Sequence, residues 1–70
     1  MSDKAYEITQ YLQKHNSVNA KEVADALGME KRLVDAYFSA GIAQLGYGYR
    51  DTTVTPSVLV LNEKGLAFKQ

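Results

Sequence analysis

Residues 19–38 read NAKEVADALGMEKRLVDAYF, and this stretch decides the fold of the 70-residue chain. Asn19 and Glu22 are spaced as a helix N-cap and the third helical residue, a pair in which each side chain can bond the backbone amide of the other. Gly28 follows, and glycine supplies the permissive backbone that a tight turn between two helices requires. The stretch therefore predicts a helix over residues 20–27 that ends in a sharp turn.

After this turn, apolar side chains recur at helical spacing. The stripe consists of Val34, Phe38, Ile42 and Leu45. Separations of four, four and three residues predict a third helix from Glu30 to Leu45. Gly41 lies inside this segment and costs about 1 kcal/mol relative to alanine, so a helix that ends at Ala40 is the alternative. We favour the longer helix because Gly46 is an equally good terminator.

The segment from Ser2 to Asn16 has the same helical period. Its apolar positions are Ala5, Ile8 and Leu12, with Tyr11 beside them. Ser2 or Asp3 can cap the start of this helix, and Asn16 can end it. The residues between this helix and Asn19 are too few for more than a turn or a single bridge of strand.

Beyond Gly46 the composition changes to β-branched and aromatic residues with a period of two. These residues are Tyr47, Tyr49, Thr52, Thr53, Val54 and Thr55, followed by Val58 to Leu61. Two such strands close together in sequence pair as a hairpin, and Pro56, the only proline, places its tip within Asp51–Ser57. Asn62 can then cap a last helical turn from Glu63 to Lys69.

The chain has no cysteine, so an apolar core must supply the stability that many short chains take from disulfides. Val18 and Val23 flank the Asn19 cap, where a hydrophobic contact fixes the angle at which the chain enters the helix. The expected core unites Val18, Val23, Leu27, Val34, Phe38, Leu59 and Leu61. A chain of this length has room for one domain, residues 1–70.

The order of these elements resembles that of a winged helix-turn-helix domain. Residues 19–38 are similar to the helix-turn-helix of many bacterial transcription regulators, in which a short helix ends in a Leu-Gly pair. The positions that carry this similarity are Ala24, Leu27, Gly28, Val34 and Phe38. Residues 58–68, VLVLNEKGLAF, resemble the return strand of the wing and the helix start that follows it. The resemblance implies an α+β fold in which a three-helix bundle is followed by a C-terminal β-hairpin wing.

The resemblance also implies a small DNA-binding protein, a transcription regulator whose third helix reads the major groove while the wing contacts flanking double-stranded DNA. The candidate DNA-binding residues are Lys21, Lys31, Arg32, Asp35, Ser39, Tyr49, Arg50 and Thr52. Lys31 and Arg32 can donate to guanine or phosphate, and Arg50 near the hairpin tip is expected to reach into a minor groove. Tyr49 either stacks on sugar and phosphate or is an ordinary half-buried strand residue.

The charge balance argues in the other direction. Eight basic and eight acidic residues cancel, whereas nucleic-acid-binding domains are commonly basic. Glu30 and Asp35 oppose phosphates unless one of them caps the helix or accepts a hydrogen bond from a cytosine amino group. The alternative function is a protein-interaction or assembly module of the same shape, on which Lys31 and Arg32 are an ordinary solvated helix face. A contiguous positive stripe across the basic candidates favours DNA, and its interruption favours a protein partner.

Other classes of function lack the residues that they need. One histidine and no cysteine cannot form a metal site, and the chain has neither a paired nucleophile and base nor a phosphate-binding glycine loop. We therefore expect no catalysis, no cofactor and no small-molecule substrate. His15 is expected to complement the dipole at the end of the first helix. No apolar run approaches about eighteen residues, so no membrane span is predicted and a cytoplasmic location is expected.

A domain of this size makes few contacts with DNA, and dimerisation is expected to double them. The candidate interface of a homodimer is either Tyr6 and Tyr11 on the first helix or Leu66 and Phe68 near the C-terminal end. These are the apolar residues that remain when the expected core is filled.

Overall fold

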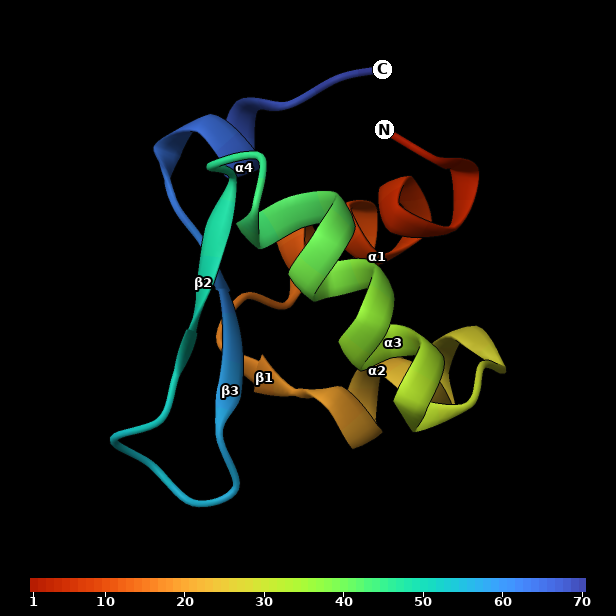
Figure 1. Ribbon diagram of the computed structural model, residues 1–70, viewed down its shortest axis with the longest axis vertical. Coiled ribbons are helices and arrows are strands. Elements are labelled where there is room, and N and C mark those ends of the chain that lie inside the picture. Colours follow the sequence, from red (N-terminus) through yellow and green to blue (C-terminus); the bar gives the residue numbers. More distant parts are fainter.

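The computed structural model describes residues 1–70, in which helices pack against one side of a three-stranded antiparallel sheet (Figure 1). The elements in chain order are α1 (Asp3–Lys14), β1 (Val18–Asn19), α2 (Ala20–Leu27), α3 (Lys31–Phe38), the π-helix η1 (Ser39–Ala43), β2 (Gly48–Asp51), β3 (Val58–Leu61) and α4 (Glu63–Ala67). The strand order is β1-β3-β2, so β3 is the central strand. The predicted α+β class is therefore confirmed.

Strands β2 and β3 form the hairpin that the period-two pattern predicts. Asp51 lies opposite Val58, so the connecting loop falls within the expected tip. In Figure 1 this loop extends away from the helices. The short β1 pairs with the other edge of β3, with Val18 opposite Leu59. This pairing ties the entrance of α2 to the centre of the sheet.

Asn16 has a larger role than the helix end that the sequence suggests. Helix α1 starts at the predicted cap, since the Ser2 hydroxyl accepts from the backbone amide of Ala5 at 3.2 Å, but its C-cap is His15. The Asn16 side chain instead bonds both backbone groups of Leu61, accepting from its N–H at 2.9 Å and donating to its carbonyl at 3.3 Å. This side-chain amide continues the pairing of β1 with β3 as far as Leu61, in the same register.

Helix α2 keeps half of the predicted reciprocal cap. The Asn19 side chain accepts from the backbone amide of Glu22 at 2.8 Å, as expected. The return bond is absent because the Glu22 carboxylate accepts from the hydroxyl of Tyr11 on α1 at 3.2 Å. Gly28 ends the helix in the left-handed conformation, at φ 66°, which the predicted turn requires.

The third helix ends at neither of the two C-terminal positions that the sequence predicts. Regular α-helix runs only to Phe38, and a π-helical turn carries the chain on to Ala43, so neither Ala40 nor Leu45 is the last helical residue. Within this turn Gly41 packs closely against α1, since a Cβ atom there would lie 2.9 Å from the Cβ of Ala5. The expected stripe therefore ends early, at the buried Ile42, and Leu45 is exposed.

The core confirms five of the seven expected residues and extends beyond them. The buried apolar residues are Ala5, Ile8, Leu12, Ala20, Val23, Ala24, Val34, Phe38, Ile42, Leu59 and Leu61. Val18 and Leu27 are instead half-buried and pack against the margin of this core. Val18 lies on a two-residue edge strand and Leu27 on the last turn of α2, so one side of each faces solvent.

Helix α4 is capped as predicted but ends two residues early. The Asn62 side chain accepts from the backbone amide of Gly65 at 2.9 Å, and the helix stops at Ala67 rather than Lys69. The stop coincides with a bond from the Gln13 side chain on α1 to the carbonyl of Phe68 at 2.8 Å. This contact holds the last residues against the first helix.

The apolar residues assigned to a dimer interface are mostly used within the chain. The Phe68 ring packs edge-on against Tyr6, with 5.9 Å between the ring centroids, and its centroid lies 4.8 Å from that of Tyr47. Tyr11 stacks on His15 at 4.7 Å. All four residues lie outside the buried core, as expected, but only Leu66 is exposed, at 45%, whereas the three aromatic residues are half-buried.

Candidate nucleic-acid interface

Three basic side chains from three different elements surround one hollow of about 240 Å³. Lys21 comes from the first turn of α2, Lys31 from the start of α3, and Arg50 from β2. The lining residues are Asn19, Ala20, Lys21, Lys31, Arg50, Pro56 and Ser57. The start of α2 and the end of the hairpin loop therefore complete the wall between the cations. The fold brings together Lys21 and Arg50, which lie 29 positions apart in the chain.

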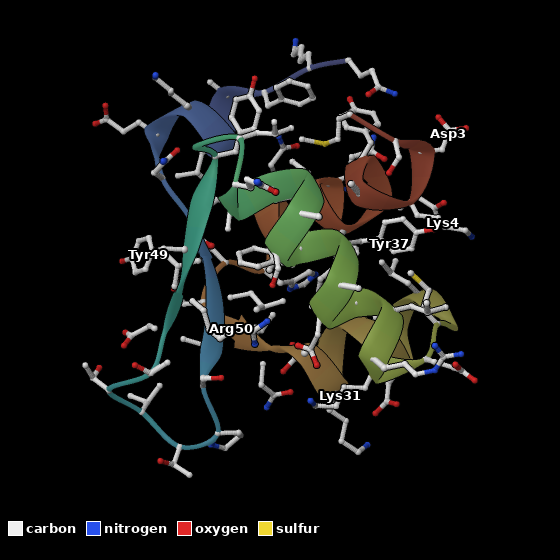
Figure 2. All side chains as sticks on the ribbon, viewed as in Figure 1. Asp3, Lys4, Lys31, Tyr37, Tyr49 and Arg50 are labelled. Carbon is white, nitrogen blue, oxygen red and sulfur yellow. The ribbon has the colours of Figure 1, made fainter.

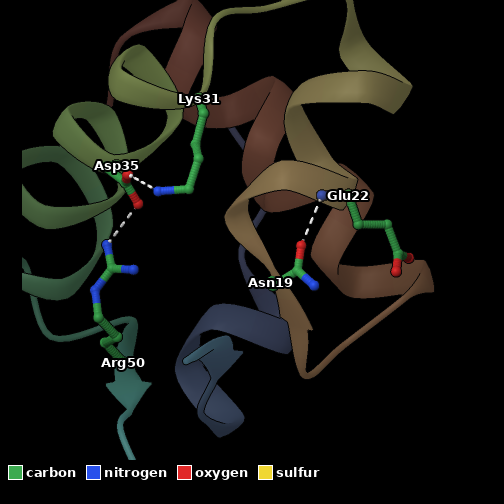
Figure 3. A network of polar contacts seen from close by, with 5 residues as sticks. All are labelled: Asn19, Glu22, Lys31, Asp35 and Arg50. Carbon is green, nitrogen blue, oxygen red and sulfur yellow. Dashed lines mark hydrogen bonds and ion pairs between the residues drawn. The ribbon is translucent and has the colours of Figure 1, made fainter. Parts of the chain in front are cut away.

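Each of these cations already has a carboxylate partner. The Lys21 ammonium lies 2.7 Å from a carboxylate oxygen of Asp25 on the same helix. Lys31 and Arg50 share Asp35, at 2.9 Å from Oδ2 and 3.0 Å from Oδ1 respectively (Figure 3). Both lysines are well exposed, and exposed pairs of this kind contribute only about 0.2–1 kcal/mol. Because these ion pairs contribute so little, another anion can replace a carboxylate beside either lysine at low cost.

Asp35 is charged at neutral pH. Partial burial of its carboxyl group raises the pKa, but hydrogen bonds from Lys31 and Arg50, together with their positive charges, outweigh this effect and leave the pKa below its ordinary value. The Lys21 ammonium is stabilised in the same way, since its hydrogen bond to Asp25 raises the lysine pKa. Each of these ion pairs therefore favours the charged form of the group whose pKa it shifts.

Arg50 is turned toward the helices rather than toward the hairpin tip. Its guanidinium carbon lies 5.9 Å from the centre of the Phe38 ring, and its side chain is 29% exposed. Figure 2 shows this side chain crossing from the sheet to α3. The reason is its place in the strand, because Arg50 lies opposite the buried Leu59 and so faces the helical side of the sheet. In this conformation Arg50 does not extend from the hairpin tip toward a minor groove, as the sequence analysis expected.

The remaining candidates divide between two faces. Arg32 and Ser39 are exposed on α3 and at the start of η1, and the Arg32 guanidinium lies 2.8 Å from a carboxylate oxygen of Glu30. Tyr49 is 54% exposed and points away from α3, on the outer face of the sheet (Figure 2). Thr52 is exposed in the hairpin loop. The fold therefore separates Tyr49 and Thr52 from the candidates on the helices.

The positive stripe across this side of the molecule is interrupted. Four cations, Lys21, Lys31, Arg32 and Arg50, are interleaved with the three carboxylates of Asp25, Glu30 and Asp35. The sequence contained the signal for two of these pairs, because a lysine four residues before an aspartate on one helix forms such a bridge. Sequence reasoning did not assign four residues that line the hollow, Asn19, Ala20, Pro56 and Ser57, or the Asp25 carboxylate that pairs with Lys21.

A second, shallow hollow of about 350 Å³ lies along α1. Its lining is Glu7, Gln10, Tyr11, Gln13, Lys14, His15 and Leu27. The ring of His15 is occupied by its stacking on Tyr11, and its position at the C-cap of α1 is the one predicted. This hollow mixes charges of both signs and groups no set of residues with a common chemistry.

Two further findings complete the description of the surface. The fold gathers no three His, Cys, Asp or Glu side chains into a group that could hold a metal ion. None of the helices has the length and apolar character needed to cross a lipid bilayer. Comparison with known protein families, curated proteins and solved structures finds no match to this chain.

Proposed function

We propose that this chain is a winged helix-turn-helix domain that binds double-stranded DNA, as a small cytoplasmic transcription regulator. The element order supports the fold assignment, since two helices joined by a Gly28 turn are followed by a hairpin whose return strand pairs with β1. In this arrangement α3 enters the major groove and the hairpin lies over the flanking backbone. The corresponding residues are Lys31, Arg32 and Asp35 on α3 and Ser39 at the start of η1.

The observation that carries the proposal is the hollow bounded by Lys21, Lys31 and Arg50. Three cations that converge from three elements match the negative charge of a phosphate backbone better than a scattered solvated surface does. The N-terminal end of α2 also borders the hollow, and the partial positive charge of a helix N-terminus adds to that of the three cations. A phosphate at the hollow would position α3 relative to the groove without reading sequence.

The ion pairs set the expected strength of binding. Each phosphate contact must replace a contact with Asp25 or Asp35, so the net gain per cation is smaller than for a free lysine. Three phosphate contacts predict that the logarithm of the binding constant falls with a slope of about −3 against the logarithm of salt concentration. Binding to mixed-sequence DNA is therefore expected to be weak near physiological salt and clear near 50 mM.

Fluorescence anisotropy with a labelled mixed-sequence duplex, measured at several salt concentrations, tests this proposal. Lys21→Ala and Lys31→Ala should each weaken binding and reduce the magnitude of the slope by about one. Lys4→Ala is the matched control, because Lys4 is also an exposed, ion-paired helix lysine but lies on α1. Binding that is absent at 50 mM salt, or that falls equally for the control, contradicts DNA binding through the hollow.

Arg32 and Arg50 separate base reading from backbone contact. Arg32→Ala should lower the preference for particular base pairs by about 1–3 kcal/mol, whereas Arg50→Ala should weaken all sequences alike. Circular dichroism must accompany the Arg50 variant, because its guanidinium also covers Phe38. Equal losses on all sequences from both variants would indicate a purely electrostatic contact.

A protein partner is the second candidate function, and the interleaved carboxylates favour it. A surface on which positive and negative side chains alternate can pair with a complementary protein surface, whereas its carboxylates repel the uniformly negative DNA backbone. Tyr49 and Val54 are also exposed on the hairpin, at 54% and 46%, and tyrosine is enriched at protein interfaces. If the folded chain binds no duplex at 50 mM salt, protein interaction becomes the favoured function.

A further inference from the structure

Asp35 holds a position on this surface that no other carboxylate shares. Its two oxygens each accept from a different cation, Lys31 on its own helix and Arg50 from the sheet. Figure 3 shows the carboxylate held between these two side chains. A carboxylate can accept about four hydrogen bonds, so each oxygen retains a free lone pair. The side chain is 30% exposed, so it is only partly covered by its neighbours.

We propose that Asp35 selects the DNA sequence by accepting a hydrogen bond from the N4 amino group of a cytosine in the major groove. The inference rests on the proposed DNA binding. It gives base recognition to an acidic residue that cannot contact phosphate favourably. A carboxylate in the groove can only accept, and the amino groups of cytosine and adenine are the only donors on the major-groove edges of the bases.

Cytosine fits a carboxylate better than adenine does. The adenine amino group lies beside N7, an acceptor that would face the second carboxylate oxygen, whereas the cytosine amino group lies beside a C–H. A cytosine at this position therefore offers the carboxylate a donor with no opposing acceptor beside it.

The order of the Asp35 side chain separates it from Glu30, the other acidic candidate on α3. Glu30 is 63% exposed, has one partner, Arg32, and makes no side-chain bond to the start of the helix. Asp35 is held from two sides, and base reading requires a side chain whose position is fixed by its neighbours. The bonds that hold it also keep the carboxyl group ionised, so it cannot become a donor near neutral pH.

Selection by Asp35 works largely through rejection. At a site with an acceptor in place of the cytosine amino group, the carboxylate loses water and gains no partner, so binding is weakened. Asp35→Asn removes this penalty and replaces the acceptor pair with one acceptor and one donor group. A carboxamide forms two bonds with adenine N6 and N7. The variant should therefore bind mixed-sequence DNA more tightly and prefer adenine where the parent prefers cytosine.

Selection from a randomised duplex library, run in parallel with the parent chain, Asp35→Asn and Asp35→Ala, tests this assignment. The expected parent site contains a preferred cytosine, which changes to adenine with Asp35→Asn and loses preference with Asp35→Ala. Asp25→Asn is the matched control, since Asp25 pairs with Lys21 but lies on α2. It should tighten binding while the preferred cytosine is kept.

Chemical change of the DNA gives a second readout that does not depend on protein folding. N4-methylcytosine keeps its base pair but loses the free amino hydrogen in the major groove, and should weaken parent binding about tenfold at the selected position. It should leave Asp35→Ala unaffected. An unchanged affinity of the parent, or the same selected base for all variants, overturns the role of Asp35 while DNA binding stands. A chain that enriches no duplex at 50 mM salt overturns both.

Discussion

Gly41→Ala tests how closely α1 and η1 pack. The glycine lies in the π-helical turn, and a Cβ atom there would be 2.9 Å from the Cβ of Ala5, which is fully buried. Carbon atoms pack best at about 3.5–4.0 Å, so the two helices would have to separate by roughly 0.6 Å. Because Ala5 has no rotatable side chain, the backbone of one helix must move.

The magnitude follows from two opposing effects. Alanine is favoured over glycine inside a helix by about 1 kcal/mol, which on its own would stabilise the chain. Overpacking of a closed core costs about 1–3 kcal/mol. We expect a net loss of about 1 kcal/mol, equivalent to a fall in melting temperature of about 4–8 °C for a domain of this size. Thermal and urea unfolding followed by circular dichroism measure this loss.

A double-mutant cycle isolates the contact. Combining Ala5→Gly with Gly41→Ala moves the methyl group from one helix to the other, so the double variant should be more stable than the sum of the single losses predicts, by at least about 0.5 kcal/mol. Ser39→Ala, an exposed position in the same π turn, is the control and should change stability little. A gain in stability from Gly41→Ala, or additive single effects, would refute the packing argument.

Three further predictions concern the core, the sheet and the ion pairs. Phe38→Ala should lower the free energy of unfolding by about 3–5 kcal/mol, because the ring is buried beneath Arg50, and an unchanged urea midpoint would contradict this. Asn16→Ala should cost about 1–3 kcal/mol by leaving both backbone groups of Leu61 without their partner, while Asn16→Asp keeps the acceptor and should lose less. The lowered pKa of Asp35 means that its ion pairs stabilise the fold above the unfolded-state pKa of about 4, and this contribution is lost as the pH falls through the lower folded-state pKa. The stability difference between the parent and Asp35→Asn should therefore shrink between about pH 5 and pH 2, and a difference independent of pH would argue against the pairs.

The proposed homodimer has its own test. Sedimentation at high micromolar concentration should show twice the mass of the chain if dimerisation doubles the contacts with DNA. A monomer under these conditions contradicts it. Since the aromatic side chains of Tyr6, Tyr11 and Phe68 pack within the chain, Leu66→Asp is the variant best suited to disrupt such an interface without disturbing the fold.

Features that depend on neighbours in sequence could be predicted from the sequence. Asn19 caps α2 through an amide three residues ahead, and Gly28 turns the chain because glycine tolerates a positive φ angle. The buried residues Val34, Phe38 and Ile42 follow a spacing of four residues that any amphipathic helix displays. In each case the partner that determines the conformation lies within one helical turn.

Features that depend on distant partners needed the tertiary structure. Asn16, which the sequence analysis placed at the end of the first helix, bonds Leu61, 45 residues away, and no local pattern indicates that partner. The Glu22 carboxylate leaves its predicted cap because the Tyr11 hydroxyl lies within reach. The π turn at Ser39–Ala43 brings Gly41 against Ala5 on another helix, and no local pattern indicates that contact.

The candidate interface shows the same division. Residue type and helical spacing determined that Lys31 and Asp35 form an ion pair on α3, since side chains four residues apart lie on one helix face. Only the tertiary structure decided that Arg50 joins them, because the register of β2 against β3 turns its side chain toward Phe38 and away from the hairpin tip. Burial of Leu59 and Leu61 against the helices fixes this register, and a one-residue change in it would turn Arg50 to the opposite face of the sheet.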